Sequence, residues 1–259
     1  MIKQEGFWNS DKVGYSKVYK QFCIDCCNDE NLFKGFRSNP SYNYIVGCDS
    51  HPSKLAEMFF YYVKNNHQQL FEKFDILQKI DEIGGPPLYN FKNNTIKISS
   101  NTLRYIKVLG DLINKYGNLD NFNIVEIGPG YGGQSVVISE IFKIKSYTYI
   151  DCVESINLIK KYTSHFNNTE RFFYNTDSIE IKEWDLVIAD NSLSEMDSDG
   201  FDFYLQTILK NSKRAYMSMN DAYRKEQTVE KVKLIFPEIQ VLKDEPVLNP
   251  NNDCYILIK

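Results

Sequence analysis

The clearest structural pattern in the chain is Asn123-Ile124-Val125-Glu126-Ile127-Gly128-Pro129-Gly130-Tyr131-Gly132-Gly133. Its first five residues are typical of a short buried strand, and the glycines after them let the backbone turn tightly and approach a ligand closely. A helix is predicted to begin at the end of this turn, where exposed backbone amides favour a negatively charged group. The stretch therefore predicts a strand, a glycine turn and a helix that together hold a nucleotide-like cofactor.

Short apolar runs alternate with amphipathic helices after this stretch. We predict strands at 123–127, 146–150, 171–174, 185–189 and 214–219, and helices at 132–142, 153–164, 199–210 and 225–235. Two closing strands near 238–243 and 253–258 are joined by a polar, Pro-broken segment, which predicts an antiparallel hairpin. The chain is therefore predicted to be an α/β protein with a mostly parallel seven-stranded sheet and an antiparallel last strand.

The first hundred residues carry helical periodicity instead. Leu55, Met58 and Phe59 recur on one helical face, and Gly84-Gly85-Pro86-Pro87 is a break. A further helix is predicted from residue 101 or 102 to 116, with Gly117 just past its end. We expect residues 1–118 to form a helical extension that caps the acceptor site, and residues 119–259 to form the cofactor-binding domain.

The composition of the 259 residues excludes several classes of protein. The formal net charge is -4 with both signs interspersed, which argues against a nucleic-acid binder. The chain contains no apolar run of about 18 residues, and its first residues lack the pattern of a secretion signal, so we expect no membrane span and a cytoplasmic protein. The oligomeric state stays open, a homo-oligomer included.

The six cysteines are expected to be reduced thiols in an intracellular chain. Cys23-x-x-Cys26-Cys27 could be half of a zinc site. Because no second Cys pair or closely spaced His pair follows, we predict no metal there.

Polar residues follow the predicted strands at their carboxyl ends, where open α/β sheets bind ligands. Asp151 ends the second strand and can accept hydrogen bonds from both hydroxyls of a ribose. Residues 175–178 follow the third strand and can contact an adenine, and Asp190-Asn191 ends the fourth. Arg104, on the helix before the first strand, is expected at the entrance. The predicted cofactor-binding residues are Glu126, Gly128, Gly130, Tyr131, Gly132, Asp151, Asp177, Ser178, Asn191 and Arg104.

The glycines alone do not identify the cofactor, because Gly128-x-Gly130-x-x-Gly133 also matches the dinucleotide fingerprint. Glu126, two residues before the first glycine, resembles the acidic residue of the first methyltransferase motif, and Gly128, Gly130 and Gly132 match the glycines of that motif. The mid-chain position of the turn and the closing hairpin also resemble class I methyltransferases.

The resemblance sharpens over a longer stretch. Residues 81–89, 98–105, 125–134, 190–195 and 212–220 together resemble the sugar O-methyltransferase family, which belongs to the class I S-adenosylmethionine-dependent methyltransferases. The resemblance implies a Rossmann-like fold and methyl transfer from S-adenosylmethionine to a hydroxyl of a deoxysugar or nucleotide-linked sugar, in glycan biosynthesis. The chain departs from the family at Pro129, where a glycine is usual, and at Asp190, where a serine is usual.

Methyl transfer to an alcohol requires alignment and one base near the methyl group. The candidates are His51 in a Pro-flanked loop, Glu195 after the fourth strand, and Asp190. A carboxylate facing the acceptor at the position of Glu195 is what the resemblance implies. In a metal-assisted alternative, which we do not favour, Asp190, Asn220 and Asp221 hold Mg²⁺ through oxygen ligands.

Three other functions share these residues. A small-molecule methyltransferase with a non-sugar acceptor would keep every cofactor residue and differ in the extension. A catalytically silent binding protein would keep the fold without turnover. A nicotinamide-dependent oxidoreductase would use the same glycine turn.

Overall fold

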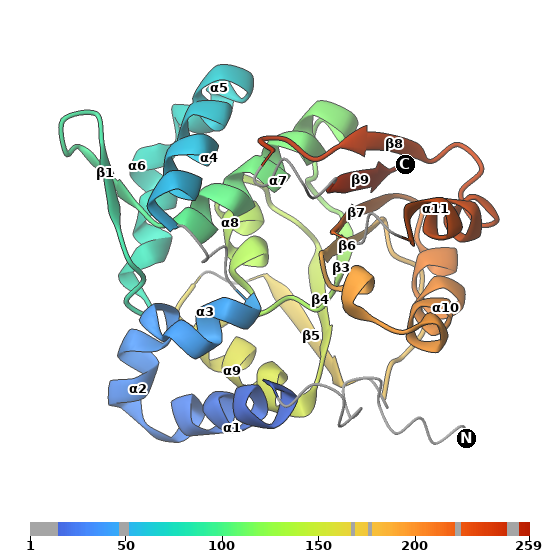
Figure 1. Ribbon diagram of the computed structural model, residues 1–259, viewed down its shortest axis with the longest axis horizontal. Helices are drawn as coiled ribbons and strands as arrows, with labels where there is room; N and C mark the ends of the chain where they lie inside the picture. Colours follow the sequence, from blue (N-terminus) through green and yellow to red (C-terminus); the bar gives the residue numbers. More distant parts are fainter. Residues whose placement is uncertain (1–14, 47–51, 167–168, 176–177, 221–223, 248–253) are drawn as a thin grey trace.

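The computed structural model describes residues 15–46, 52–166, 169–175, 178–220, 224–247 and 254–259. A seven-stranded sheet lies at the centre, with helices on both faces (Figure 1). Its strands are β3 (Asn123–Ile127), β4 (Ser146–Asp151), β5 (Glu170–Asn175), β6 (Leu186–Asp190), β7 (Ala215–Met219), β8 (Gln240–Lys243) and β9 (Tyr255–Ile258).

The strand order is β5-β4-β3-β6-β7-β9-β8. Strands β3 to β7 pair in parallel, whereas β9 is antiparallel to both β7 and β8. The inserted β9 distinguishes this sheet from the dinucleotide-binding sheet, whose six strands run in the order 3-2-1-4-5-6. The predicted architecture is confirmed: a Rossmann-like, mostly parallel seven-stranded sheet with an antiparallel last strand, and an N-terminal helical region.

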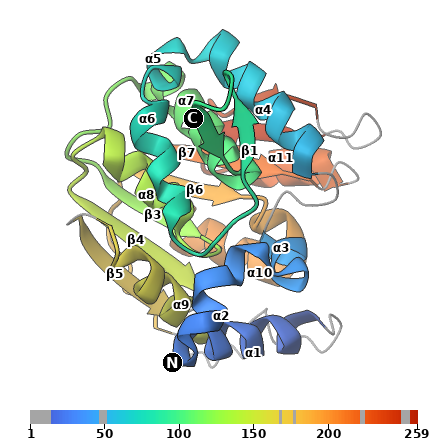
Figure 2. The same cartoon turned by 90° about the vertical axis from the view of Figure 1, so that its left-hand side faces the viewer.

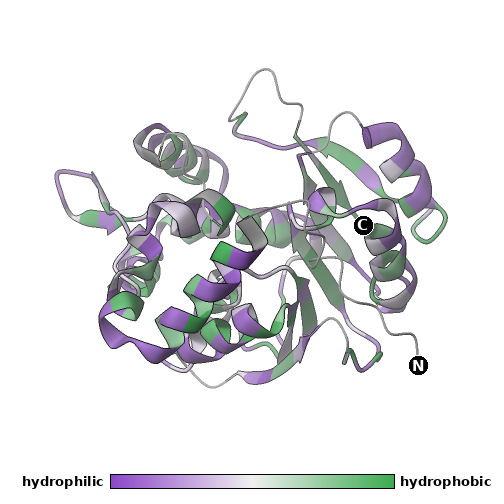
Figure 3. Ribbon diagram, turned by 60° about the horizontal axis from the view of Figure 1, so that its bottom comes forward, coloured by the Kyte–Doolittle hydropathy of each residue, from purple (hydrophilic) through white to green (hydrophobic). Residues whose placement is uncertain are grey.

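Alternate residues of the central strands belong to two separate cores, because successive side chains of a strand point to opposite faces. Ile124 faces the core built with α7 (Ser100–Tyr116), α8 (Gly133–Ile141) and α9 (Val153–Thr163). Val125 and Ile127 face the core built with α10 (Ser198–Thr207) and α11 (Lys225–Lys233). Figure 3 accordingly shows mostly green, hydrophobic strands between helices of mixed colour.

The N-terminal helices pack on the same side of the sheet as α7 to α9 and share one core with them. They are α1 (Tyr15–Asn28), α2 (Glu30–Gly35), α3 (Pro40–Val46), α4 (Pro52–Asn66), α5 (Gln68–Phe71) and α6 (Phe74–Leu77). Figure 2 shows α1 beside α9, and α4 lies along α7. Within the described ranges, no helix combines the length and apolar character that a membrane span needs.

The domain boundary near residue 118 stays a prediction. Helix α7, on the extension side of that boundary, lies against the sheet, since the Tyr116 hydroxyl donates to the Ala215 carbonyl at 2.9 Å. The described part of the chain also contains the short 3-10 helices η2 (Phe36–Ser38), η3 (Gln78–Glu82), η4 (Leu193–Glu195) and η5 (Leu209–Asn211).

A small hairpin differs from the all-helical extension that we expected. Strands β1 (Tyr89–Phe91) and β2 (Ile96–Ile98) pair as an antiparallel two-stranded sheet. Lys92, Asn93 and Asn94 between them all have positive φ angles, of 47°, 54° and 69°. Strands of three residues are too short to show a period of two in the sequence, so the periodicity of the flanking helices dominated the prediction.

One buried ion pair joins the segments of the extension to each other. The Arg37 guanidinium on η2 and the Asp81 carboxylate on η3 lie 2.6 Å apart, with side-chain exposures of 0% and 1%. Asp81 also accepts hydrogen bonds from the Ser99 amide at 2.6 Å and the Thr102 hydroxyl at 2.6 Å, at the start of α7. Nη1 of Arg37 donates to the Ile80 and Ile83 carbonyls, whereas its Nε has no partner among the described residues. The Asp81 carboxylate is therefore surrounded by donors and paired with a cation, as burial demands.

We expect Arg37→Met to lower the free energy of unfolding by about 3 to 5 kcal/mol, because it leaves the Asp81 carboxylate buried without its counter-charge. Urea denaturation followed by circular dichroism measures this change. The control is Lys231→Met, which removes one partner of the exposed Lys231–Asp202 pair and should cost less than about 1 kcal/mol. Equal losses in the two variants would contradict the role of the buried pair.

Candidate functional site

The glycine turn after β3 has backbone angles and close neighbours that leave no room for side chains. Gly128 and Gly130 have φ angles of +66° and +60°. A Cβ at Gly128 would lie 2.4 Å from the Cβ of Ser192, and one at Gly130 would lie 2.5 Å from Cγ1 of Val46. Gly132 follows as the N-cap of α8 and provides no side-chain hydrogen bond to the first amides of the helix. The turn thus packs closely against Ser192 and Val46 and leads into the backbone amides at the start of α8.

Asp151 lies beside this turn at the tip of the neighbouring strand. The Gly128 amide donates to the Ile150 carbonyl at 2.9 Å, which fixes the turn against the end of β4. Asp151 is 6% exposed and accepts a hydrogen bond from the Cys152 amide at 2.7 Å. No ion pair reaches it from the described part of the chain, and burial raises its pKa to about 6. A buried carboxylate without a cation partner suits a ligand that brings hydroxyl donors.

Two predicted cofactor residues point into the core beside the turn. Glu126 is 3% exposed and accepts a hydrogen bond from the Tyr147 hydroxyl at 2.7 Å. Burial raises the pKa of Glu126 to about 8, so this carboxyl is largely protonated at neutral pH. Tyr131 is 1% exposed and lies under the Arg37 guanidinium, 4.8 Å from its ring centroid. Their contact with a cofactor stays a prediction.

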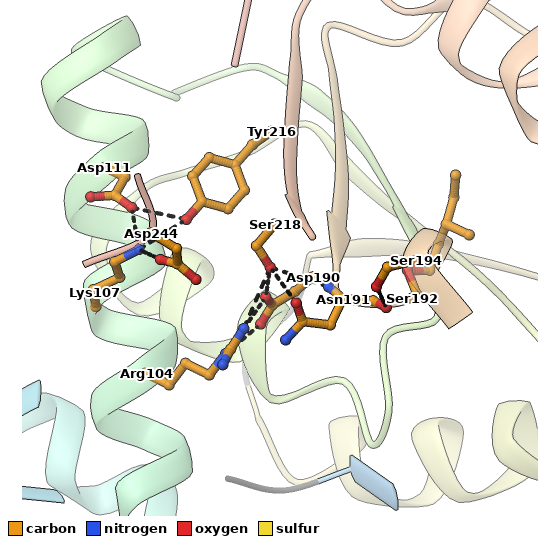
Figure 4. A network of polar contacts seen from close by, with 11 residues as sticks. Arg104, Lys107, Asp111, Asp190, Asn191, Ser192, Ser194, Tyr216, Ser218 and Asp244 are labelled. Carbon is orange, nitrogen blue, oxygen red and sulfur yellow. Dashed lines mark hydrogen bonds and ion pairs between the residues drawn. The ribbon is translucent and has the colours of Figure 1, made fainter. Parts of the chain in front are cut away.

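The structure pairs two of our candidates with each other (Figure 4). Nε of Arg104 donates to Oδ2 of Asp190 at 2.8 Å, Nη2 donates to Oδ1 at 2.5 Å, and the Ser218 hydroxyl also donates to Asp190. Burial alone would raise the pKa of Asp190, but the charge and hydrogen bonds of Arg104 outweigh it and lower the pKa. Asp190 is therefore an ionised, paired carboxylate and is poorly suited to act as a base.

Asn191 follows directly with a φ angle of +60°, in the left-handed region that Asn tolerates better than most residues. Its amide donates to the Ser218 carbonyl at 3.0 Å. Residues held in this region cluster at functional sites, where the surrounding structure fixes them. The bend turns the chain from the end of β6 toward the glycine turn, where the Ser192 hydroxyl donates to the Ile127 carbonyl at 2.5 Å.

Glu195 ends the 3-10 helix η4 on the same loop. The Arg224 guanidinium holds the loop on both sides of it, donating to the Ser194 carbonyl at 2.5 Å and the Met196 carbonyl at 3.0 Å. Glu195 is exposed, yet its carboxyl is enclosed by enough protein that lost hydration raises its pKa to about 7. Because this pKa lies near neutral pH, Glu195 is the described candidate best suited to act as a base.

Not every predicted site residue can be placed beside the glycine turn. His51, Asp177 and Asp221 lie outside the described residues. Ser178 is exposed, and its amide donates to the Asn175 carbonyl at 3.1 Å. Among the described residues, no group of three or more His, Cys, Asp or Glu side chains could hold a metal ion.

Sequence reasoning missed three residues that fix the site: Ser192, Ser218 and Arg224. Ser218 lies in a segment that carried the family resemblance, so a polar residue near the end of a strand was the available signal. The sequence gives no signal for Arg224, since it acts on backbone carbonyls about 30 residues away.

No family model matches the chain, and no curated protein matches it in sequence. Among solved structures, the N-methyltransferase NodS from Bradyrhizobium japonicum WM9, in complex with S-adenosyl-l-homocysteine, is similar at 14% identity, over 60% of this chain and 84% of that chain, with a TM-score of 0.47. An S-adenosylmethionine-dependent methyltransferase from Clostridium acetobutylicum ATCC 824 is similar at 10% identity, over 60% and 89%, with a TM-score of 0.45.

A third similar structure is precorrin-6y C5,15-methyltransferase from Geobacter metallireducens GS-15, at 14% identity over 59% of this chain and 86% of that chain, with a TM-score of 0.41. The fold assignment rests on the strand order of the sheet itself and not on these likenesses.

We expect Asp151→Asn to stabilise the ligand-free protein. Folding raises the pKa of Asp151 from 3.8 to about 6, so ionisation opposes folding fully above pH 6 and no longer does so below pH 4. The variant should gain up to about 3 kcal/mol at pH 8 and little at pH 4. Thermal denaturation at the two pH values measures the difference.

The matched control for this experiment is Asp190→Asn. It changes a carboxylate whose pKa is lowered by pairing, so it should destabilise the protein at pH 8. A loss of stability in Asp151→Asn as large as in Asp190→Asn would contradict the assignment of Asp151 as an unpaired carboxylate.

Proposed function

We propose that this chain is an S-adenosylmethionine-dependent methyltransferase that methylates a hydroxyl of a deoxysugar or nucleotide-linked sugar. The observation that carries the proposal is the Asp151 carboxylate, which is buried without a cation partner among the described residues beside a glycine turn whose close packing leaves no room for Cβ atoms, at the tips of β3 and β4. The residues therefore fit an adenosine-containing cofactor, with Asp151 accepting from the ribose and the turn at Gly128 and Gly130 passing close to it. The sheet with its inserted β9 favours a methyltransferase over a nicotinamide-dependent enzyme.

The sugar acceptor is supported by the resemblance of residues 80 to 220 to sugar O-methyltransferases. With such an acceptor, the protein would act on small molecules in glycan or polysaccharide synthesis in the cytoplasm. A non-sugar acceptor, or a silent binding protein of the same fold, would leave the cofactor residues unchanged and is distinguished by the experiments below.

The cofactor supplies a methyl group on a sulfonium centre, already activated for displacement. The protein then has to align the acceptor oxygen with that methyl group and take up the hydroxyl proton. Glu195 would accept this proton, because its carboxyl has a pKa of about 7 and its loop is held against the glycine turn through Ser192. Asp190 would fix the position of Arg104 instead of acting as a base.

We expect Asp151→Ala to weaken the binding of S-adenosylhomocysteine about 10- to 100-fold, since it loses hydrogen bonds from the ribose to a charged acceptor. Isothermal titration calorimetry measures the dissociation constant. Asp199→Ala, at an exposed carboxylate on α10, is the control and should bind as the wild type does. Binding of NAD but not of S-adenosylhomocysteine by the wild type would overturn the proposal.

We expect Glu195→Gln to lower turnover about 100-fold or more while the affinity for S-adenosylhomocysteine is kept. The wild-type rate should rise as the pH increases through about 7, because the carboxylate is the basic form. Purified protein is incubated with S-adenosylmethionine and nucleotide-linked deoxysugars, and products that gain one methylene unit are detected by mass spectrometry. Unchanged turnover in the variant would exclude Glu195 as the base, and tight cofactor binding with no methylated sugar would favour a different acceptor or a silent protein.

A further inference from the structure

Helix α1 of the N-terminal extension lies along α9, the helix that follows β4 (Figure 2). At the end of α1, Lys161 of α9 donates to the Cys26 and Cys27 carbonyls at 3.1 and 3.2 Å. Nearer the start of α1, the half-buried Tyr19 donates its hydroxyl hydrogen to the Ser155 hydroxyl of α9 at 3.2 Å. Polar contacts therefore fix the extension to this helix at two places.

Ser155 connects Tyr19 with the glycine turn. The serine is fully buried, and its hydroxyl donates to the Gly130 carbonyl at 3.0 Å. It also faces Asp151: burial raises the pKa of that carboxyl, and hydrogen bonds from the Cys152 amide and from Ser155 lower it in part. Tyr19, Ser155 and Gly130 thus form a chain of hydrogen bonds that runs from the extension into the turn, beside Asp151.

The direction of this chain follows from what a hydroxyl can do. A serine hydroxyl has one proton to donate and two lone pairs that accept. When Tyr19 donates to Ser155 it occupies a lone pair, so the serine proton stays available to the Gly130 carbonyl. Hydrogen bonds in such a chain also polarise and strengthen each other. Without the Tyr19 hydroxyl, the Ser155 hydroxyl is free to turn its proton from Gly130 toward Asp151.

The Gly130 peptide is where this hold has an effect. Gly130 has a φ angle of +60°, and glycine occupies positive and negative φ about equally, so the residue does not fix its own backbone. The peptide unit is planar and trans, so the Gly130 carbonyl and the Tyr131 amide point in opposite directions. The hydrogen bond from Ser155 therefore fixes the direction of both groups in the turn.

We propose that Tyr19 is a positioning residue of the cofactor site, which acts through Ser155 to hold the Gly130 peptide in the orientation that binds S-adenosylmethionine. This inference rests on the proposed function, in which the glycine turn and Asp151 hold the cofactor. Tyr19 acts without touching the cofactor itself. The extension then controls cofactor binding, in addition to the part in acceptor binding that we expect from it.

The test is calorimetric titration of the full-length protein with S-adenosylhomocysteine. Tyr19→Phe should weaken binding about three- to tenfold, which corresponds to one hydrogen bond between neutral groups. Ser155→Ala should weaken binding at least as much, and the double variant should bind as Ser155→Ala does, because Tyr19 has no effect without the serine hydroxyl. Wild-type affinity in Tyr19→Phe, or losses that add in the double variant, would overturn the inference and leave the proposed function intact.

Tyr116→Phe is the matched control. The Tyr116 hydroxyl also anchors a helix, through the Ala215 and Lys259 carbonyls, but Ala215 begins β7 and so lies at the opposite end of the sheet from the glycine turn. The variant should lower the melting temperature and keep the wild-type affinity. An equal loss of affinity in Tyr116→Phe and Tyr19→Phe would mean that any weakened helix contact impairs binding, and would overturn the inference.

A spectroscopic signature separates positioning from general loosening. In protein labelled on tyrosine with a nitrogen isotope, the amide resonance of Tyr131, identified by its loss in Tyr131→Phe, reports on the peptide that follows Gly130. It should shift in Tyr19→Phe and in Ser155→Ala and keep its position in Tyr116→Phe. An unchanged resonance in Tyr19→Phe would contradict a role in positioning this peptide. If the wild type binds no S-adenosylhomocysteine, the proposed function itself fails, whatever the resonances show.

Discussion

A buried carboxylate needs hydrogen-bond donors around it. In this protein the donors to Asp81 come from separate segments of the chain, and their bonds to it hold these segments together. Its oxygens accept from Arg37, Ser99 and Thr102, which belong to η2 and to the start of α7. Arg37 then covers the ring of Tyr131 in the glycine turn. Moving the extension away from the turn would break the contact between Arg37 and Tyr131, so the guanidinium that holds the extension together also packs against the glycine turn.

The presence or absence of a neighbouring cation also distinguishes the carboxyl groups near the turn. Asp190 has the Arg104 guanidinium as its partner and a lowered pKa, so it stays ionised and holds a fixed position. Asp151 and Glu195 have no such cation among the described residues, and burial raises the pKa of both. The paired carboxylate therefore fixes the position of Arg104, and the two carboxyl groups without a cation are those to which we assign the ligand and the proton in our proposal.

The sequence predicts the sheet well because its strands are short apolar runs bounded by turns; β6, predicted at 185–189, spans Leu186–Asp190. Asp151 could be predicted for the same reason, since its position depends only on where β4 ends. The pairing of Arg104 with Asp190 could not be predicted, because these residues are 86 positions apart and each could pair with several other charged residues. The hairpin β1–β2 was missed because three residues carry too little pattern to distinguish a strand from a turn.

Buried polar groups without partners are distributed unevenly, and the distribution bears on function. Some lie far from the turn: the indole N–H of Trp184 is unpaired among the described residues, in the core on the opposite face of the sheet. Around the turn, however, the costs are of another kind: a buried carboxylate without a cation at Asp151 and a left-handed backbone at Asn191. Both lower the stability of the ligand-free fold, and a bound nucleoside would supply donors to Asp151. Since Asp81 shows that this chain can pair a buried carboxylate with a cation, the lack of a cation beside Asp151 among the described residues favours a ligand that brings donors to it.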